Sequence, residues 1–409
     1  MADCILPLER VAARRSVLRV AGLWTVVAAA WILLPEPVHA QDLSVRATAA
    51  ERVMLDDNIR LEQDSDGWVF GSTTSLGLDV DSRGPLVGIN LDLGADYNHF
   101  TGPGASSDLN SLDWHAGLGV DRRFLRGEVG ARAEYRRQAV RESELEDTGA
   151  TEGDAERESI LGRVTAAYDV SSVDRVDGTV EVRDVSFDED QPSDLRNPFL
   201  SASATMRWAR ELTPRETGTA ILRSIYFDAD DRFQTTSQSY SIGGLYEQRA
   251  TPRLTWFAGV GVGVVDEERD TAGGGRDSSL SPALNLDVGG SYTLERILIE
   301  LALSQGMEPS ATGRLRQQRL LRANLEYEAA TDTVVAVTAF NVSQRADTEF
   351  TLFDEYDREY TVLEGRIAWL LLPDLRFATG YRFRHDDGGD GASSHAVFAT
   401  LSYGFSLLP

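Results

Sequence analysis

Thirteen residues from Leu86 to Asn98 alternate between apolar and polar side chains. In an extended chain successive side chains point to opposite faces, so this run has one apolar wall, with Leu91 and Leu93, and one polar wall, with Asp92. Ordinary strands last about five or six residues, whereas a tilted strand that crosses a bilayer needs roughly nine to eleven. Because similar runs recur along the chain, the sequence predicts long amphipathic strands of the membrane-spanning kind.

The first forty residues have the layout of an export signal. Four arginines precede an apolar run over residues 20–34, and a small-residue site ends at Ala40. This order of basic, apolar and small residues is typical of a cleaved signal peptide, and the apolar run is short for a membrane-spanning helix. We therefore expect a signal peptide over residues 1–40 and one mature domain over residues 41–409, with an uncleaved anchor as the alternative.

Composition narrows the classes of protein that remain. The chain carries 65 acidic and 40 basic side chains, a net charge of −25, which argues against nucleic acid as a partner. The single cysteine, Cys4, lies in the expected signal, so the mature chain would have no disulfide and no cysteine metal ligand. We expect no cofactor. A secreted β protein and an outer-membrane β-barrel of a Gram-negative cell remain.

The strand-like runs are joined alternately by short turns and by longer, more acidic loops, as in a barrel built from hairpins. Eight turns and nine loops predict an all-β, transmembrane, antiparallel up-and-down β-barrel of eighteen strands, with sixteen as the alternative. An even strand number puts both chain ends and the short turns on the periplasmic side. The turns are predicted at residues 82–84, 125–127, 171–174, 212–215, 250–253, 293–296, 330–332 and 372–374. The loops are predicted near residues 62–67, 100–110, 143–157, 188–197, 228–233, 266–279, 306–313, 345–353 and 385–394.

One parity of most predicted strands carries the charged side chains. An arginine that faces lipid at the bilayer midplane costs about 2 to 4 kcal/mol, so this parity must face the lumen. Opposed rows of arginines and carboxylates could produce a transverse field across a constriction; the alternative is that they form neutralising pairs that fill the wall. The candidate pore-lining residues are Asp92, Asp96, Glu128, Arg132, Glu134, Arg136, Arg163, Glu181, Arg183, Arg207, Arg322, Glu326, Glu364, Arg366, Arg376 and Arg382.

Aromatic side chains gather toward the ends of the predicted strands, where they suit a membrane interface. A general preference of aromatic residues for strands is the alternative explanation. The expected girdle consists of Trp68, Tyr97, Phe100, Trp114, Phe124, Tyr135, Tyr168, Trp208, Tyr292, Trp369, Tyr381 and Phe383.

Some segments give weaker signals. Residues 216–228 and 332–344 alternate poorly, so their phase is a guess. The alternating glycines at 259–263 predict an inward face cleared of side chains, against which a loop or plug could pack. Acidic loops at 188–194 and 386–391 offer oxygen ligands of the kind calcium prefers, but neither follows the helix-loop-helix pattern. We expect solvated loops without a metal site, although divalent ions could bridge their carboxylates to lipopolysaccharide phosphates.

Short motifs resemble a known group. The run Leu-Asp-Asp-Asn-Ile-Arg-Leu at 55–61, the Thr-Pro-Arg turns and the ending Leu-Ser-Tyr-Gly-Phe at 401–405 are similar to outer-membrane proteins of the β-barrel porin 2 type. The resemblance covers most of the mature chain, and some members accompany exopolysaccharide loci. Such barrels usually stop on an aromatic residue that the barrel-assembly machinery recognises, whereas this chain runs on to Pro409. The hypothesis is that Phe405 provides the signal.

Three functions fit such a barrel. The first, which we predict, is a porin-like passive channel for small solutes in the outer membrane, because sixteen to eighteen strands leave an aqueous lumen. The second, implied by the resemblance, is export or surface attachment of a polysaccharide, with Phe257 and Phe398 as weak candidates for a sugar track. The third is an enzyme at the barrel rim, which would need a paired histidine; we expect none. The mature histidines are His99, His115, His385 and His395.

Overall fold

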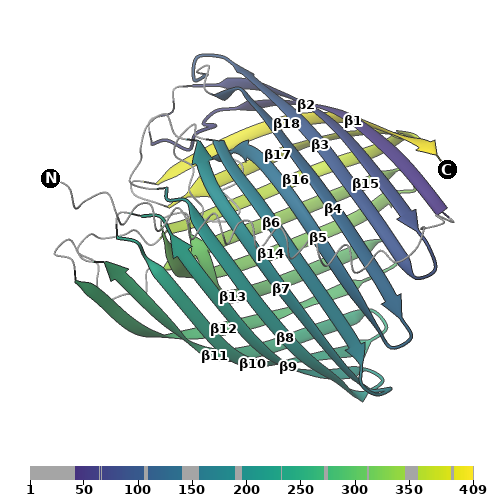
Figure 1. Ribbon diagram of the computed structural model, residues 1–409. Coiled ribbons are helices and arrows are strands. Elements are labelled where there is room, and N and C mark those ends of the chain that lie inside the picture. The colour runs from purple at the N-terminus through teal and green to yellow at the C-terminus, as the bar shows by residue number, and fades with distance from the viewer. Residues whose placement is uncertain are drawn as a thin grey trace.

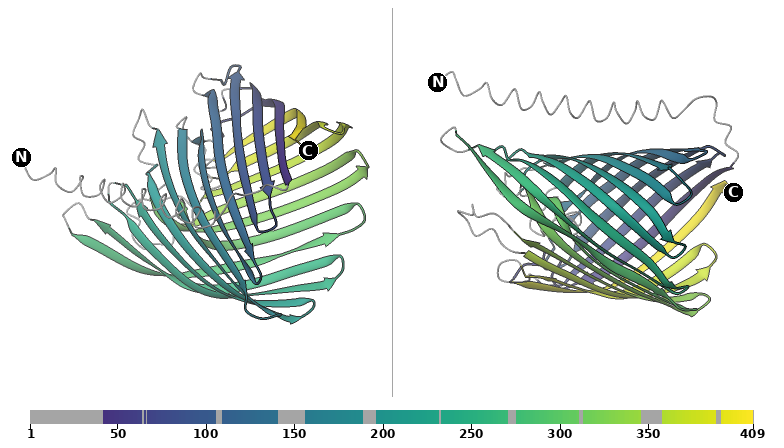
Figure 2. Two further views of the ribbon diagram at one scale, coloured as in Figure 1. Left: turned by 45° about the vertical axis from the view of Figure 1, so that its right-hand side comes forward. Right: turned by 90° about the horizontal axis from the view of Figure 1, so that it is seen from below.

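The protein is a barrel of eighteen antiparallel strands (Figures 1 and 2). The computed structural model describes residues 42–63, 65, 67–105, 109–140, 156–188, 196–231, 233–270, 275–310, 313–345, 358–387 and 391–408. The strands are β1 (Asp42–Asp56), β2 (Val69–Arg83), β3 (Val87–Thr101), β4 (Ser111–Phe124), β5 (Gly127–Ala139), β6 (Glu156–Asp169), β7 (Asp174–Asp188), β8 (Phe199–Thr213), β9 (Glu216–Ala229), β10 (Thr236–Thr251), β11 (Leu254–Asp270), β12 (Arg276–Thr293), β13 (Ile297–Ser310), β14 (Arg314–Ala330), β15 (Thr333–Arg345), β16 (Arg358–Leu372), β17 (Leu375–Asp386) and β18 (Ala392–Leu408). No helix in these ranges is long and apolar enough to cross a membrane.

Each strand pairs with its neighbours in the sequence, and β1 closes the sheet by pairing with β18. The closing register runs from Arg46↔Ser406 to Asp56↔Ala396. The prediction of eighteen strands is confirmed. The expected signal peptide lies outside the described residues and stays a prediction.

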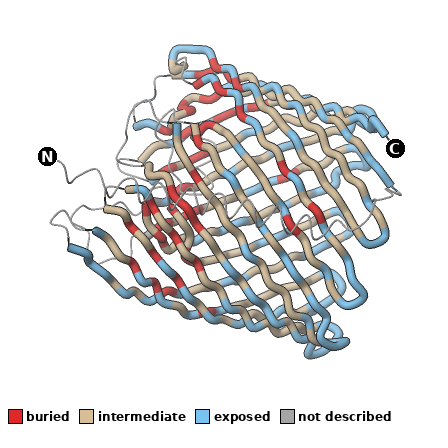
Figure 3. Tube along the Cα trace, viewed as in Figure 1, coloured by how far each residue is buried: buried red, intermediate tan, exposed pale blue. Residues whose placement is uncertain are grey.

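Short and long connections lie at opposite ends of the barrel, as predicted (Figure 1). Tight turns at 214–215, 252–253, 331–332 and 373–374 close hairpins at one end, where the C-terminus also lies. All eight predicted turns fall between consecutive strands. Buried residues gather toward the long-loop end, so loops and wall pack together there (Figure 3). We call the two ends the turn end and the loop end.

The exterior is apolar and the interior is polar, because side chains alternate across the wall. On β3, Leu93 and Tyr97 are exposed on the outer face while Asn98 is buried inside. The two strands of uncertain phase follow the same rule. On β9, Leu222 faces out and its neighbour Arg223 lines an interior cavity. Exposed leucines and valines around the outside form the surface that acyl chains solvate.

Aromatic residues on the outer face of β8, β10–β12, β14 and β16–β18 lie close to the turn end. They are Trp208, Tyr246, Trp256, Tyr292, Tyr327, Trp369, Phe377 and Tyr403. The expected girdle is wrong at Phe100, which faces inward at 5% exposure and packs with Ile59 and Leu109. Phe100 has the parity of Asn98, so its place on the strand assigns it to the inner face.

Glu51 breaks the alternation on β1. Glu51 shares the outer parity of β1 with Val53, since its register partners are Thr74 and the exposed Leu401. The hydroxyls of Ser72 and Thr74 donate to its two oxygens at 2.6 and 2.7 Å. Local hydrogen bonds therefore satisfy this charge on the outer face.

The wall separates at one seam. Between β12 and β13 the described register extends only from Thr293↔Leu298 to Leu286↔Gln305. Beyond it, the loop-end part of the β13–β14 hairpin bends into the lumen, where Gly313 lies against Asp231 of the β9–β10 loop. The side-chain amides of Gln305 and Gln317 donate to the Leu284 carbonyl at 3.4 and 3.0 Å. These bonds partly replace the backbone hydrogen bonds that β12 and β13 do not form beyond this point.

An apolar cluster holds the bent hairpin in place. Met307 and Leu315 of the hairpin pack with Phe199, Ile225 and Phe227 from β8 and β9, all at most 8% exposed. The Arg223 guanidinium also bonds the Glu308 carboxylate at 3.0 Å across the lumen. Because the lumen is apolar here, the inner face of β9 carries apolar residues, which explains why β9 alternates poorly.

Candidate solute pathway in the lumen

All the candidate pore-lining residues have the inner parity of their strands. Directly paired residues in a sheet share a face, and register pairs such as Arg132↔Arg163 and Arg163↔Glu181 extend this face from strand to strand. Arg163, Glu181 and Arg207 line one interior cavity, and Arg322, Glu364 and Arg382 line another. Apart from Arg207 on β8, the candidate residues lie in three sectors of the wall, which we call the paired, acidic and basic sectors.

The paired sector, on β5–β7, contains arginines that meet carboxylates. Arg163 bonds Glu181 at 2.6 Å, and Arg183 reaches the same carboxylate at 3.4 Å. Glu134 lies between two arginines of its own strand, with Arg132 at 3.3 Å. The neutralising-pair interpretation therefore describes this sector.

The acidic sector, on β2–β4, has an excess of inward carboxylates. They are Asp79, Asp81, Asp92, Asp96, Asp113 and Asp121. Asp113 accepts hydrogen bonds from Asn98 and from the backbone of Ala139, and it packs in the wall. The sector therefore presents mainly aspartates to the lumen.

The basic sector, on β14, β16, β17 and β1, contains Arg322, Arg366, Arg376, Arg382 and Arg52. Within the described residues, the first four form no ion pair. The Arg382 guanidinium donates only to the Met54 sulfur, at 3.4 Å, and its buried Nε has no acceptor in the described chain. Since sulfur is a weak acceptor, Arg382 has unused capacity for an anion.

Arg384, the next inward residue after Arg382 on β17, has a different set of partners. Its guanidinium bonds the Asp56 carboxylate at 2.8 Å, with exposures of 7% and 0% for the two side chains. It also donates to Ser394 at 3.0 Å and to the Ile59 carbonyl at 3.3 Å. This network ties the start of the β1–β2 loop into the lumen, and Ile59 lines the cavity below.

Aromatic rings accompany the basic sector. The Arg52 guanidinium lies over the Phe398 ring at 4.2 Å, and that of Arg322 lies over Phe340 at 5.6 Å. Phe398 was expected in the lumen, whereas Phe340 was missed because its strand has no clear phase. Tyr360 and Arg52 were also missed, although each has the parity of a charged neighbour, Glu364 and Arg46.

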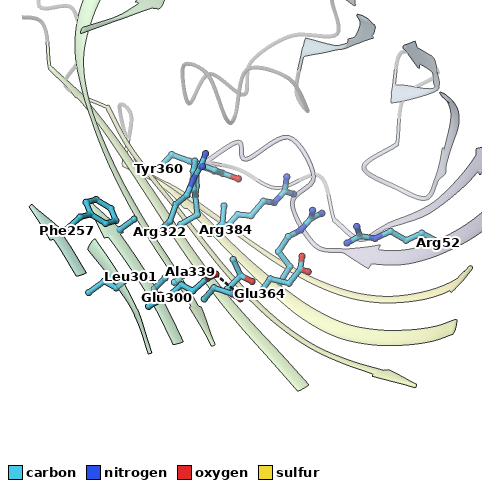
Figure 4. Close-up of a pocket in the computed structure, with 18 of the residues that line it drawn as sticks. Arg52, Phe257, Glu300, Leu301, Arg322, Ala339, Tyr360, Glu364 and Arg384 are labelled. Carbon is cyan, nitrogen blue, oxygen red and sulfur yellow. Dashed lines mark hydrogen bonds between the residues drawn. The ribbon is translucent and has the colours of Figure 1, made fainter. Parts of the chain in front are cut away.

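A cavity of about 920 Å³ joins these groups to the far wall. Figure 4 shows Arg52 entering it from β1, while Arg322 and Glu364 enter from β14 and β16. Glu247 of β10 lines the same cavity, and β10 is halfway round the barrel from β1. Arginine thus opposes carboxylate across the lumen, as the transverse-field hypothesis requires. The carboxylate on the opposite wall is Glu247. Glu300 of β13 and Glu364 of β16 line the same cavity from strands next to or within the basic sector, and the aspartate sector also lies beside the basic one.

The glycine run of β11 has the predicted role of clearing the inner face. Gly259 and Gly261 line a second cavity of about 600 Å³. A Cβ atom added at Gly243, opposite Gly261, would meet the Val260 carbonyl at 2.9 Å. The bent β13–β14 hairpin borders this cavity through Glu308.

The histidines are spread over both faces. His115 bonds Asp92 at 3.1 Å inside the lumen, instead of the Asp113 that shares its strand. His385 and His395 are on the outer face, where their rings contact Phe383 and bond Ser393 or Tyr381. No group of three metal-ligating side chains occurs in the described ranges. The acidic segments 189–195 and 388–390 lie outside those ranges.

Comparisons with known proteins find barrels of this kind. No protein-family model and no curated protein matches the chain. Among solved structures, OccAB3 of Acinetobacter baumannii is similar with 12% identity and a TM-score of 0.48, covering 90% of this chain and 100% of the other. A BenF-like porin of Pseudomonas fluorescens has 13% identity and a TM-score of 0.45, with 90% and 99% covered. The outer-membrane protein OpdK of Pseudomonas aeruginosa has 11% identity and a TM-score of 0.47, with the same coverage. These values are too low to transfer a solute to this chain.

Proposed function

We propose that this chain is a passive channel of the Gram-negative outer membrane that favours small organic anions. The observation that carries the proposal is the basic sector, where Arg322 and Arg382 face a 920 Å³ cavity without a carboxylate partner in the described residues. An eighteen-strand barrel is wide enough for an aqueous lumen. The apolar exterior supports a place in lipid, with the turn end in the periplasm.

The charge arrangement suits transient binding. Guanidinium groups bond carboxylates strongly and in two-point geometry, and rings such as Phe340 and Phe398 offer contact to an apolar part of the solute. Glu247 across the cavity and Glu300 on the strand next to Arg322 weaken the attraction. A channel needs binding that is favourable enough to admit the solute and weak enough to release it.

Planar-bilayer recordings test the proposal. Arg382→Gln removes the half-buried cation, and we expect the anion-to-cation permeability ratio to fall about two- to fivefold at low salt, since the field is screened at high salt. Arg376→Gln is the matched control, because Arg376 is on the same face of β17 but does not line the cavity. A closed barrel, or equal effects of both variants, would contradict the proposal.

We also propose that the chain is of the β-barrel porin 2 type. The β-barrel porin 2 type is supported by the short motifs described above, and it carries the second candidate, polysaccharide export. More lumen aromatics than expected, such as Phe340 and Tyr360, favour keeping that candidate. Liposome swelling with sugars of graded size separates the two, because a strict size cut-off near a disaccharide would exclude a polysaccharide.

We also propose that Phe405 has a role in assembly of the barrel. Phe405 lies on the outer face of β18, 37% exposed, next to Ala47 of β1 at the closing seam. That position supports the hypothesis that it serves as the signal for the barrel-assembly machinery. Normal assembly of Phe405→Ala would contradict it.

A further inference from the structure

The outer wall is hollowed over β6–β12, strands that lie side by side (Figure 1). An exterior groove of about 620 Å³ begins near the turn end, and a second hollow of about 900 Å³ continues toward the loop end. The floor of the first is made of small residues: Gly218, Ala220, Gly244 and Ala258. Its sides are large residues: Trp208, Tyr246, Val260, Leu286 and Val288. This shape fits a flexible hydrocarbon chain.

The turn end of the groove carries a cation beside two carboxylates. Arg210 lines the groove with its side chain 55% exposed, and its Nε lies 3.8 Å from Asp174. Glu216 lies on the same outer face. It is two residues before Gly218 on β9, and Gly218 pairs with Arg210. Gln248 and Thr213 hold its carboxylate by hydrogen bonds of 3.1 and 3.0 Å.

These fixed charges select a type of headgroup. Within the described residues the terminal nitrogens of Arg210 have no acceptor, so they can donate to a phosphate. A second charge on the ligand must be positive, because two carboxylates outnumber one guanidinium at this rim. A purely anionic headgroup would meet repulsion from Asp174 and Glu216.

We propose that this groove binds one zwitterionic phospholipid that carries a primary ammonium, with its phosphate at Arg210, its ammonium toward Glu216 and an acyl chain over Ala220 and Gly244. The assignment rests on the proposed outer-membrane orientation, because the turn end then lies at the periplasmic leaflet, where such a lipid can reach it. Trp208 and Tyr246 flank the headgroup as interfacial aromatic residues do.

Native mass spectrometry of the full mature barrel tests the site. The detergent-purified protein is titrated with phosphatidylethanolamine, phosphatidylcholine and phosphatidylglycerol of identical acyl chains. We expect one retained phosphatidylethanolamine, bound at least about fivefold more tightly than the other two, since a lost charge-assisted contact of about 1 kcal/mol corresponds to that factor. Equal retention of all three lipids would overturn the headgroup assignment.

Two variants and a control locate the lipid. Ala220→Leu fills the groove floor and should abolish the retained lipid, whereas Arg210→Gln should remove only the headgroup preference. Ala323→Leu, an outward position on β14 next to Ala339, is the matched control and should bind as the unmodified chain does. A dimer that forms through this face, or retention unaffected by Ala220→Leu, would overturn the proposal. Conductance of the same samples is measured in parallel, so a conducting channel that retains no lipid refutes this site without refuting the channel.

Discussion

The paired and basic sectors use the same residue in two ways. On β5–β7 the arginines meet carboxylates of the same or the adjacent strand, as Arg163 meets Glu181 at 2.6 Å. In the basic sector, Arg322 lies over the Phe340 ring and Arg382 donates to the Met54 sulfur. An arginine in the lumen therefore says little by itself, because the register around it decides whether its charge is available to a solute.

Arg384 is the exception inside the basic sector, since it is buried and forms an ion pair with Asp56. Its charge serves to attach the β1–β2 loop to the wall near β17 and β18. The lumen therefore contains arginines in three situations. Arg384 is buried and paired with a carboxylate, Arg163 is exposed and paired, and Arg382 has no carboxylate partner in the described residues. Each can be tested separately.

The largest effect is expected from Asp56→Ala. It leaves the Arg384 guanidinium buried without its carboxylate, and breaking such a buried pair from one side costs about 3 to 5 kcal/mol. Urea unfolding of the refolded barrel in lipid vesicles, followed by tryptophan fluorescence, measures the loss in free energy of unfolding.

The double variant Asp56→Ala with Arg384→Met is the control for this loss. Replacing both charges by uncharged groups should restore most of the stability, because no buried charge is left uncompensated. A loss below about 1 kcal/mol in the single variant would mean that water already reaches Arg384 and that the pair is no different from those of β5–β7.

An intermediate effect is expected from Glu181→Gln, which converts part of the paired sector into a basic one. Arg163 and Arg183 then lose their shared carboxylate, and the anion-to-cation permeability ratio should rise about twofold at low salt and return toward the original value at high salt. Reversal potentials in planar bilayers measure it. An unchanged ratio would indicate that the solute path avoids this wall.

Strand number and side-chain parity could be predicted from the sequence because they depend on local spacing. The Thr-Pro-Arg turns at Pro214 and Pro252 lie between strands as local turn chemistry predicts, and alternation places Arg163 and Arg382 on the inner face without reference to any neighbour. The candidate residues therefore share the inner face, and their role in lining a pore stays a prediction.

Pairing could not be predicted, since it depends on which strands become neighbours and at what register. Arg384 and Asp56 are separated by most of the chain and meet only because β18 closes onto β1. The open seam between β12 and β13 has a similar origin. Gly306 and Pro309 weaken the end of β13 as a strand, but the direction of the bend depends on the apolar cluster across the lumen in which Met307 is buried.

The smallest effect is expected for the stability contributed by the Arg163–Glu181 pair. Both groups remain accessible to lumen water, at 43% and 21% exposure, so solvent screens their attraction and a double-mutant cycle should give a coupling of about 0.2 to 1 kcal/mol. Urea unfolding of Arg163→Gln, Glu181→Gln and the double variant measures this coupling. A value above about 2 kcal/mol would place the pair with Arg384–Asp56 and remove the distinction between buried and exposed pairs. A small coupling free energy would mean that the pair contributes little to stability and mainly neutralises the charge of that wall. An anionic solute would then be attracted by the basic sector and not by the paired sector.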